Sequence, residues 1–134
     1  MNKLDLSRPG IYLVIPNGKK LRPLDLDRRR IHKVKKVNNS YIKFGKSERP
    51  LIYRYKDYKK IFGEDVNFNP ILIIEDILSL KRFERYVGAR FENYKITNPN
   101  SNRKLEWMSG ISFSDAKSII LNSYTEFKAK KWFN

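Results

Sequence analysis

Short apolar runs separated by turn-forming residues occupy the first third of the chain. Residues 11–15 form one run, which a Pro-Asn-Gly turn closes, and residues 37–45 form another, which an Asn-Asn pair interrupts. Runs of this length, bounded by turn residues, predict strands. We expect the two strands to pair antiparallel, with residues 19–36 as their connection.

Apolar stripes at helical spacing follow these strands. In residues 51–62, apolar side chains recur at i, i+4, i+7 and i+11 after a proline, and residues 83–94 show a similar spacing. Ser112 and Asp115 form a capping-box pattern, which predicts a closing helix over about 112–130. The spacing therefore predicts three helices.

Two further runs complete the predicted sheet. Residues 71–74 form a continuous apolar run after Pro70, consistent with a strand covered on both faces, and residues 104–108 predict a short edge strand. The order is β-β-α-β-α-(β)-α, with no internal repeat and no linker rich in Pro, Gly or Ser. It predicts a single α/β domain over residues 1–134, a small sandwich in which helices flank a mainly antiparallel three-stranded sheet.

The charge balance narrows the class of partner. The 134 residues are 40% hydrophobic, which suits a folded domain, and 29 Lys and Arg against 14 Asp and Glu give a net charge of +15. This excess favours a polyanion, above all nucleic acid, although ribosomal and membrane-surface proteins share it. Cysteine is absent, which excludes disulfides and thiolate zinc sites. Without a signal-peptide core or a membrane-length apolar run, we expect a soluble, intracellular, cytoplasmic protein with no membrane partner.

Nine of the cations lie in residues 19–36, within a basic insertion at about 17–38. We expect this segment to grip DNA, in which case binding weakens steeply with salt. A run of solvated charges is the alternative. The expected contacts are Lys19, Lys20, Arg28, Arg29, Arg30, Lys33, Lys35 and Lys36. The single histidine, His32, is interpreted as a surface residue.

Several charged residues stand where they could serve a site. Arg54 and Glu84 each lie at the edge of a helical stripe, from which a charge can reach over the rim of the core toward a groove, or simply snorkel or pair. Lys46 stands in a Gly-Lys-Ser turn typical of phosphate loops. The Walker spacing requires an upstream glycine where this chain has Ser40, so that motif is excluded.

Two motifs, GIY at 10–12 and KFGKS at 43–47, stand at the start of the first predicted strand and the end of the second. They resemble the paired motifs of the GIY-YIG endonuclease superfamily, and the second is similar to the "KIG-K-S" version of bacteriophage and viral members. Arg54 and Tyr58 resemble the family's helix arginine and its following aromatic residue. Glu84 falls in a segment similar to the one that carries the family's single metal-binding glutamate.

The resemblance extends from about residue 10 to residue 127. The segment KLEWM at 104–108 is similar to an "EWF"-like segment of the phage subgroup. Within it, Glu106 is interpreted either as a residue near the metal or the DNA, or as a plain edge-strand carboxylate. The expected fold is therefore GIY-YIG-like over the single domain.

The chain departs from the family pattern at three points. The connection from Tyr12 to Lys43 spans 31 positions, much longer than the tight hairpin of most relatives. Gly45 and Arg54 are nine positions apart, so Tyr53 competes by counting for the arginine position. Arg54 is preferred because that position requires a cation. Lys43 stands where many relatives carry tyrosine.

The resemblance implies metal-assisted hydrolysis of DNA phosphodiester bonds by a phage-type endonuclease. Glu84 would hold one divalent ion, Mg²⁺ or Mn²⁺, which would act as a Lewis acid and steady the leaving 3′ oxygen. Arg54 would bind the non-bridging oxygens, where negative charge builds in the transition state.

The same resemblance assigns the remaining roles. Tyr12 would orient or help deprotonate the attacking water, provided that neighbouring cations lower its pKa. Lys43 and Lys46 would supply these charges, and Lys43 could relay the proton. Tyr58 would hydrogen-bond the phosphate or the water. By themselves, both tyrosines are also explained as core aromatic residues.

Two other functions stay open. One is a non-catalytic nucleic-acid-binding module on the same scaffold, in which catalysis was lost with the tyrosine at position 43. The other is a basic RNA- or ribosome-associated protein. Cleavage specificity and oligomeric state are not indicated by the sequence. A one-site enzyme cuts both strands either as a homodimer or by two nicks, and a targeting partner protein could supply specificity.

Overall fold

The computed structural model describes residues 5–19, 22–23, 36–97 and 104–131. Its elements, in chain order, are β1 Gly10–Ile15, β2 Arg22–Pro23, β3 Lys36–Val37, β4 Ile42–Ser47, α1 Leu51–Phe62, β5 Asn67–Ile73, α2 Ile77–Arg90, the short 3₁₀ helix η2 Glu92–Tyr94, β6 Lys95–Thr97, β7 Lys104–Met108 and α3 Phe113–Lys131. The prediction of an α/β fold is confirmed, and α1 and α3 begin and end within a residue of the predicted bounds.

The main sheet has five strands in the order β5-β1-β4-β7-β6, all paired antiparallel. The antiparallel pairing of β1 with β4 is confirmed. The predicted three strands are too few, because β7 pairs with β4 and brings β6 with it, so that β7 lies inside the sheet and β6 at its edge. A separate two-stranded sheet joins β2 and β3.

The strand predicted over residues 37–45 is divided into two elements. A turn separates β3 from β4, in which the amide of Tyr41 donates to the carbonyl of Asn38 at 3.0 Å. The Asn38 side chain accepts from the amide of Ser40, the local bond typical of an Asx turn. The Asn-Asn pair thus ends β3, and β4 begins only at Ile42, where the prediction had one interrupted strand.

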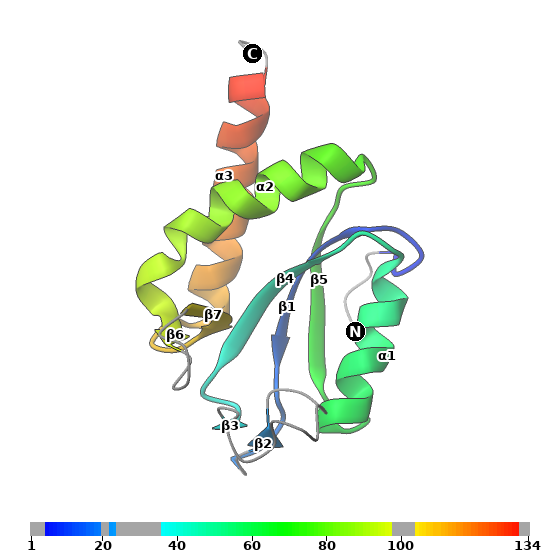
Figure 1. The fold of residues 1–134 in the computed structure, drawn as a ribbon, viewed down its shortest axis with the longest axis vertical. Coiled ribbons are helices and arrows are strands. Elements are labelled where there is room, and N and C mark those ends of the chain that lie inside the picture. The colour runs from blue at the N-terminus through cyan, green and yellow to red at the C-terminus, as the bar shows by residue number, and fades with distance from the viewer. Residues whose placement is uncertain (1–4, 20–21, 24–35, 98–103, 132–134) are drawn as a thin grey trace.

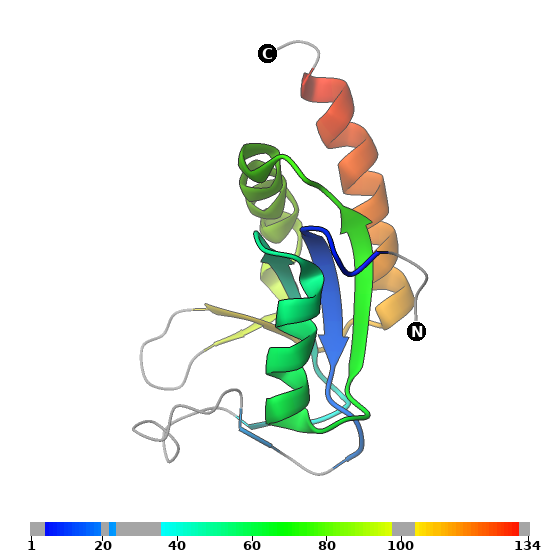
Figure 2. The same cartoon turned by 90° about the vertical axis from the view of Figure 1, so that its right-hand side faces the viewer.

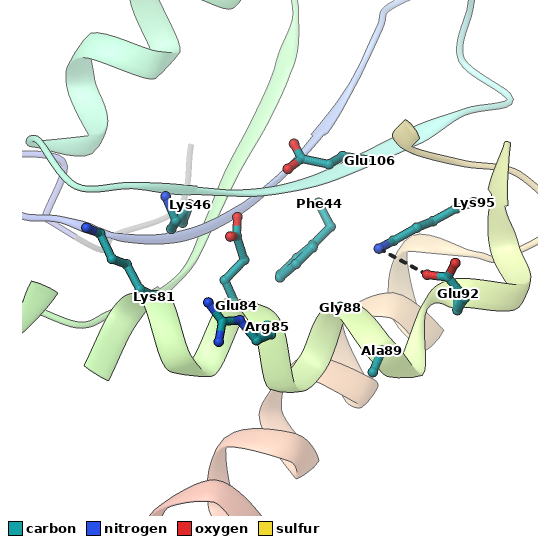
Figure 3. A pocket seen from close by; sticks show the side chains of 10 residues that line it. All are labelled: Phe44, Lys46, Lys81, Glu84, Arg85, Gly88, Ala89, Glu92, Lys95 and Glu106. Atoms are coloured by element: carbon teal, nitrogen blue, oxygen red, sulfur yellow. Dashed lines mark ion pairs between the residues drawn. The ribbon is translucent and has the colours of Figure 1, made fainter. Parts of the chain in front are cut away.

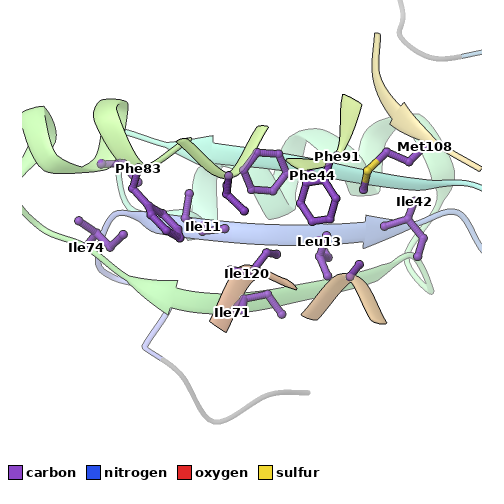
Figure 4. Packing of buried hydrophobic residues seen from close by; sticks show 13 residues of the cluster. Ile11, Leu13, Ile42, Phe44, Ile71, Ile74, Phe83, Phe91, Met108 and Ile120 are labelled. Carbon is purple, nitrogen blue, oxygen red and sulfur yellow. The ribbon is translucent and has the colours of Figure 1, made fainter. Parts of the chain in front are cut away.

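Helices cover the sheet on both faces (Figures 1 and 2). Side chains alternate across a strand, so Tyr12 and Val14 of β1 pack with α1 while Ile11 and Leu13 pack with α2 and α3. Figure 4 shows the second of these cores from close by, with Phe83 of α2 and Ile120 of α3 turned toward the strands. The sheet therefore holds one apolar core on each face.

Local signals explain where the helices begin. The amide of Ser79 donates to the carboxylate of Asp76, the N-cap of α2, and the amide of Asp115 donates to the hydroxyl of Ser112 at 3.0 Å. The Ser112 capping interaction is thus confirmed. Helix α1 follows Pro50 and ends at Gly63, whose φ of 102° is readily available only to glycine.

Strand β5 begins four residues earlier than predicted and contains Pro70. Proline lacks an amide hydrogen and is tolerated in edge strands, and β5 is the outer strand beside β1. Helix α3, the longest element, packs against α2 in the apolar core, and Arg90 of α2 forms an ion pair with Glu126 of α3. Among the helices that the structure describes, none is long and apolar enough to cross a membrane.

Candidate functional site

Two buried tyrosines join the sheet to α1. The hydroxyl oxygens of Tyr12, on β1, and Tyr58, on α1, lie 2.9 Å apart, and the two residues are only 2% and 5% exposed. The Tyr12 ring stacks on Phe68 with centroids 5.0 Å apart. Packing therefore holds both phenols in place, and each hydroxyl has a hydrogen-bond partner.

The buried environment shifts the pKa values of both phenols. Burial, followed by the neighbouring Tyr58, raises the pKa of Tyr12 well above its ordinary value, although Lys43 and Arg54 oppose the change. Burial likewise raises the pKa of Tyr58 to about 12. The lowering of the Tyr12 pKa that was expected from nearby lysines is outweighed. Burial thus makes both phenols harder to ionise, and each has the other as its hydrogen-bond partner.

Steric contacts explain why glycine stands at positions 10 and 45 in the two sequence motifs. Tyr12 lies opposite Gly45 across the β1–β4 ladder, and a Cβ at position 45 would stand 2.5 Å from the Tyr12 hydroxyl oxygen. A Cβ on Gly10 would overlap the carbonyl oxygen of Leu72, next to a register shift in the β1–β5 pairing. Both positions accommodate a close approach of neighbouring atoms that any side chain would block.

The two motif lysines leave β4 on opposite faces, because they are three residues apart. Lys43 faces α1: its Nζ lies 5.2 Å from the centre of the Tyr58 ring and 3.7 Å from a carboxylate oxygen of Glu106. Lys46 lies two residues after Phe44 and therefore on the same face of β4, which packs on the α2 side. Its side chain pairs with Glu48 at 2.7 Å. Lys43 thus lies beside the tyrosine pair, whereas Lys46 lines the cavity beside α2.

That cavity, of about 510 Å³, opens between β4 and α2 (Figure 3). Glu84 projects into it from α2, toward β4. The lining side chains are Phe44, Lys46, Lys81, Glu84, Arg85, Gly88, Ala89, Glu92, Lys95 and Glu106. Partial burial and the charge of Glu106 raise the pKa of Glu84, and Lys46 and Lys95 oppose this change. A carboxylate in these surroundings gains from a nearby cation.

A smaller cavity, of about 190 Å³, lies where β4 meets α1. Arg54 lines it, half exposed, with its guanidinium 3.9 Å from Asp57. Lys46 lines both cavities, so they adjoin at this residue. The charge of Arg54 also acts on the Tyr12 and Tyr58 hydroxyls. Glu84, Lys46 and Arg54 thus line two adjoining cavities, whereas Tyr12, Tyr58 and Lys43 are not among the residues that line either one.

The predicted DNA contacts are placed only in part. Lys19 is exposed in the turn that follows β1, and the backbone of Lys36 belongs to β3. The other predicted contacts, Lys20, Arg28, Arg29, Arg30, Lys33 and Lys35, lie outside the described residues, as does His32.

Two residues gain importance from the structure. Glu106, which the sequence left open, lines the Glu84 cavity and also pairs with Lys43, so it connects the two parts of the site. Arg49 was not singled out, yet it lines the smaller cavity with its guanidinium 4.1 Å from the centre of the Tyr53 ring. Arg49 precedes Pro50, the N-cap of α1, so the i, i+4 rule for side chains on one helix did not indicate this contact.

The carboxylates that the structure describes suit a metal ion held by only one or two protein ligands. Within the described part of the chain, no group of three or more His, Cys, Asp or Glu side chains could enclose an ion. Mg²⁺ is often held by one or two carboxylates, with water and phosphate oxygens as the other ligands. Glu84, half-buried and open to a cavity with room for such ligands, suits that mode.

Comparisons of this chain with family models, curated proteins and solved structures found no match.

Proposed function

We propose that this protein is a metal-dependent endonuclease that hydrolyses DNA phosphodiester bonds, of the GIY-YIG type in its phage or viral branch. The observation that carries the proposal is the position of Lys46. This lysine lines both the cavity of Glu84 and the cavity of Arg54, so one phosphate could reach an acid that suits a metal and two cations that suit its oxygens.

The charged residues have distinct roles in this proposal. Arg54 and Lys46 bind the non-bridging oxygens of the scissile phosphate, where negative charge grows as water attacks phosphorus. Glu84 would hold one Mg²⁺ or Mn²⁺ ion, which when bound supplies Lewis-acid stabilisation of the phosphate and of the leaving 3′ oxygen. The reaction forms one P–O bond to water and breaks the P–O bond to the 3′ oxygen, which takes up a proton.

The tyrosine pair orients the reactants. Two phenols carry two hydroxyl hydrogens, and the bond between Tyr12 and Tyr58 uses one of them. In this proposal the second hydrogen would bond to a water or a phosphate oxygen. Burial makes both phenols poor bases, so in this proposal another group takes the proton from the attacking water. Lys43 would relay it by passing one of its own protons to Glu106, its carboxylate partner at 3.7 Å, as it takes one from the water.

The second candidate function is a non-catalytic nucleic-acid-binding module. The net charge of +15 favours it as strongly as it favours a nuclease, and Lys43 in place of the motif tyrosine weakens the case for catalysis. A binding module has no use for an acid in a cavity beside phosphate-binding cations, because a carboxylate there repels DNA. For this reason we favour the enzyme.

Cleavage of supercoiled plasmid tests the proposal. We expect the wild-type protein to nick the plasmid with Mg²⁺ or Mn²⁺, and EDTA to stop the reaction. Glu84→Gln and Arg54→Ala should each lower the rate by about 10²-fold or more, the usual effect of removing a group that stabilises transition-state charge. Glu64→Gln, which removes an exposed carboxylate that lines neither cavity, is the matched control.

Unchanged metal-dependent nicking in Glu84→Gln would remove this residue from the site. DNA binding without cleavage, for linear, branched and single-stranded substrates and both metals, would favour the binding module. Separating nicked from linear products also tells whether two sites act together, as a homodimer would, or one strand is cut at a time.

A further inference from the structure

The smaller cavity contains a cation that the proposed reaction does not use. The residues that line it are Lys46, Ser47, Glu48, Arg49, Tyr53, Arg54 and Asp57. Lys46 is paired with Glu48, and Arg54 lies near Asp57. Arg49, by contrast, forms no ion pair with any residue that the structure describes. With three cations against two carboxylates, the cavity has a net charge of +1.

Arg49 is held in position from two sides. The buried hydroxyl of Ser47 donates to the Arg49 backbone carbonyl at 2.6 Å, which ties the segment between β4 and α1. The guanidinium lies 4.1 Å from the centre of the Tyr53 ring, a cation–π contact. Stacking leaves the in-plane N–H donors of the guanidinium free to point outward, which suits two oxygens of a phosphate.

The first backbone amides of α1 do not form an anion site. Its first amides are already bonded, Leu51 to the carbonyl of Arg8 and Ile52 to the carbonyl of Leu6. Helix N-termini bind anions through free amides. An anion in this cavity must therefore bind to side chains, and Arg49 is the one without a carboxylate partner in the described part of the chain.

We propose that Arg49 binds a DNA backbone phosphate adjoining the scissile one, and that Tyr53 is the positioning residue that holds the guanidinium for this contact. The inference rests on the proposed function in that the ligand is DNA. A strand that places one phosphate between Glu84 and Arg54 passes Lys46, where the two cavities meet, and then reaches Arg49. Tyr53, 43% exposed, lines the same cavity as Arg49.

Binding in the absence of metal tests the inference. The probe is a fluorescein-labelled 20-base-pair DNA duplex in EDTA, and anisotropy gives the affinity between 50 and 200 mM NaCl. Loss of one phosphate contact lowers the slope of log K against log salt by about 0.9. We expect Arg49→Gln to show this decrease and to weaken binding by about 5- to 10-fold. Arg82→Gln, which removes the same charge from an exposed position that lines neither cavity, should leave the slope unchanged.

An unchanged slope in Arg49→Gln, or an equal decrease in Arg82→Gln, would overturn the contact. Tyr53→Phe keeps the ring and should retain wild-type binding, whereas Tyr53→Ala should lose part of the affinity that Arg49→Gln loses. In the Arg49→Gln background, Tyr53→Ala should cost nothing more. A further loss there would show that Tyr53 contacts DNA by itself, and would overturn its positioning role.

The outcome is independent of catalysis. The duplex assay contains no divalent ion and measures no cleavage, so the Arg49 contact can be found in a protein that never cuts DNA. If plasmid cleavage is observed, Arg49→Gln should raise KM and leave kcat within about threefold of wild type, because the contact is made before and during the reaction alike. A drop in kcat with KM unchanged would contradict a binding role.

Discussion

The hydroxyl oxygens of Tyr12 and Tyr58 meet at 2.9 Å although the residues are 46 positions apart. One lies on the second strand of the sheet order and the other on the helix that covers it. Both phenols are buried, and within the described residues no buried side-chain polar atom lacks a hydrogen-bond partner. The pair thus links the sheet to α1 by a polar contact inside an apolar core.

We expect the two single removals of a hydroxyl from this pair to cost more stability in sum than the removal of both hydroxyls together. Tyr58→Phe leaves the Tyr12 hydroxyl buried without this partner, and we expect a loss of about 1–2 kcal/mol in the free energy of unfolding. Tyr12→Phe should cost a similar amount. The double variant should lose clearly less than the sum, because no hydroxyl is stranded. Urea denaturation measures all three, and strict additivity would show that the two hydroxyls do not depend on each other.

Alkaline pH should weaken the fold through the same pair. An unfolded tyrosine ionises near pH 10, whereas burial holds the pKa of Tyr58 at about 12 and that of Tyr12 well above its ordinary value. Above pH 10 the unfolded state therefore binds fewer protons than the folded state, and stability falls as pH rises toward 12, by up to about 1.4 kcal/mol per pH unit for each tyrosine.

Urea midpoints at pH 9 and pH 11 check this expectation. The variant with both Tyr12→Phe and Tyr58→Phe should lose less stability over that interval than the wild type does. Other groups titrate in both proteins and cancel in the comparison. Equal losses would mean that the pair ionises as freely in the folded state as in the unfolded chain.

Gly45→Ala should destabilise the protein through Tyr12. The added methyl group would stand 2.5 Å from the Tyr12 hydroxyl oxygen, and forcing an atom into a packed site costs roughly 1–3 kcal/mol. Gly88→Ala is the matched control, because its methyl group meets only Lys95 Nζ at 3.7 Å. Within helix α2 that change should be neutral or stabilising by up to about 1 kcal/mol. Thermal unfolding of both variants gives the comparison, and equal stability of the two would contradict the steric reason for Gly45.

Lys43→Gln should slow cleavage of bound DNA while leaving the fold intact. The change removes a charge that lies over Tyr58 and pairs with Glu106, and we expect a decrease in kcat of about 10²-fold. Lys43→Arg keeps the charge but cannot pass on a proton, so it should restore only the part of the rate that depends on charge. Single-turnover kinetics with plasmid DNA provides the measurement.

Helix α1 offers a control for Lys43. Lys59 makes a comparable pair of contacts, with its Nζ 4.7 Å from the Tyr55 ring centre and 3.8 Å from Glu64, away from both cavities. Lys59→Gln should therefore leave kcat near the wild-type value. If both substitutions reduced kcat alike, the effect would come from general charge, and the role proposed for Lys43 would be wrong.

Local pattern was sufficient for most of the secondary structure. The apolar stripe of 51–62 predicted α1 with its bounds, and Ser112 predicted the start of α3, because helical periodicity and capping involve residues within a few positions of one another. The position of Pro70 illustrates the limit. Its place inside β5 follows from the strand lying at the edge of the sheet, which only the pairing of distant segments decides.

The sequence by itself determined which residues could form the site, through two short motifs and the charges that follow them. Only the tertiary structure decided how they meet: Lys43 and Lys46 leave β4 on opposite faces, Glu106 joins Lys43 to the Glu84 cavity, and burial raises the pKa of Tyr12. The reason is physical, since cavities, buried hydroxyl pairs and pKa shifts arise from side chains brought together across the sheet. Such contacts depend on strand order and register, which no local pattern contains.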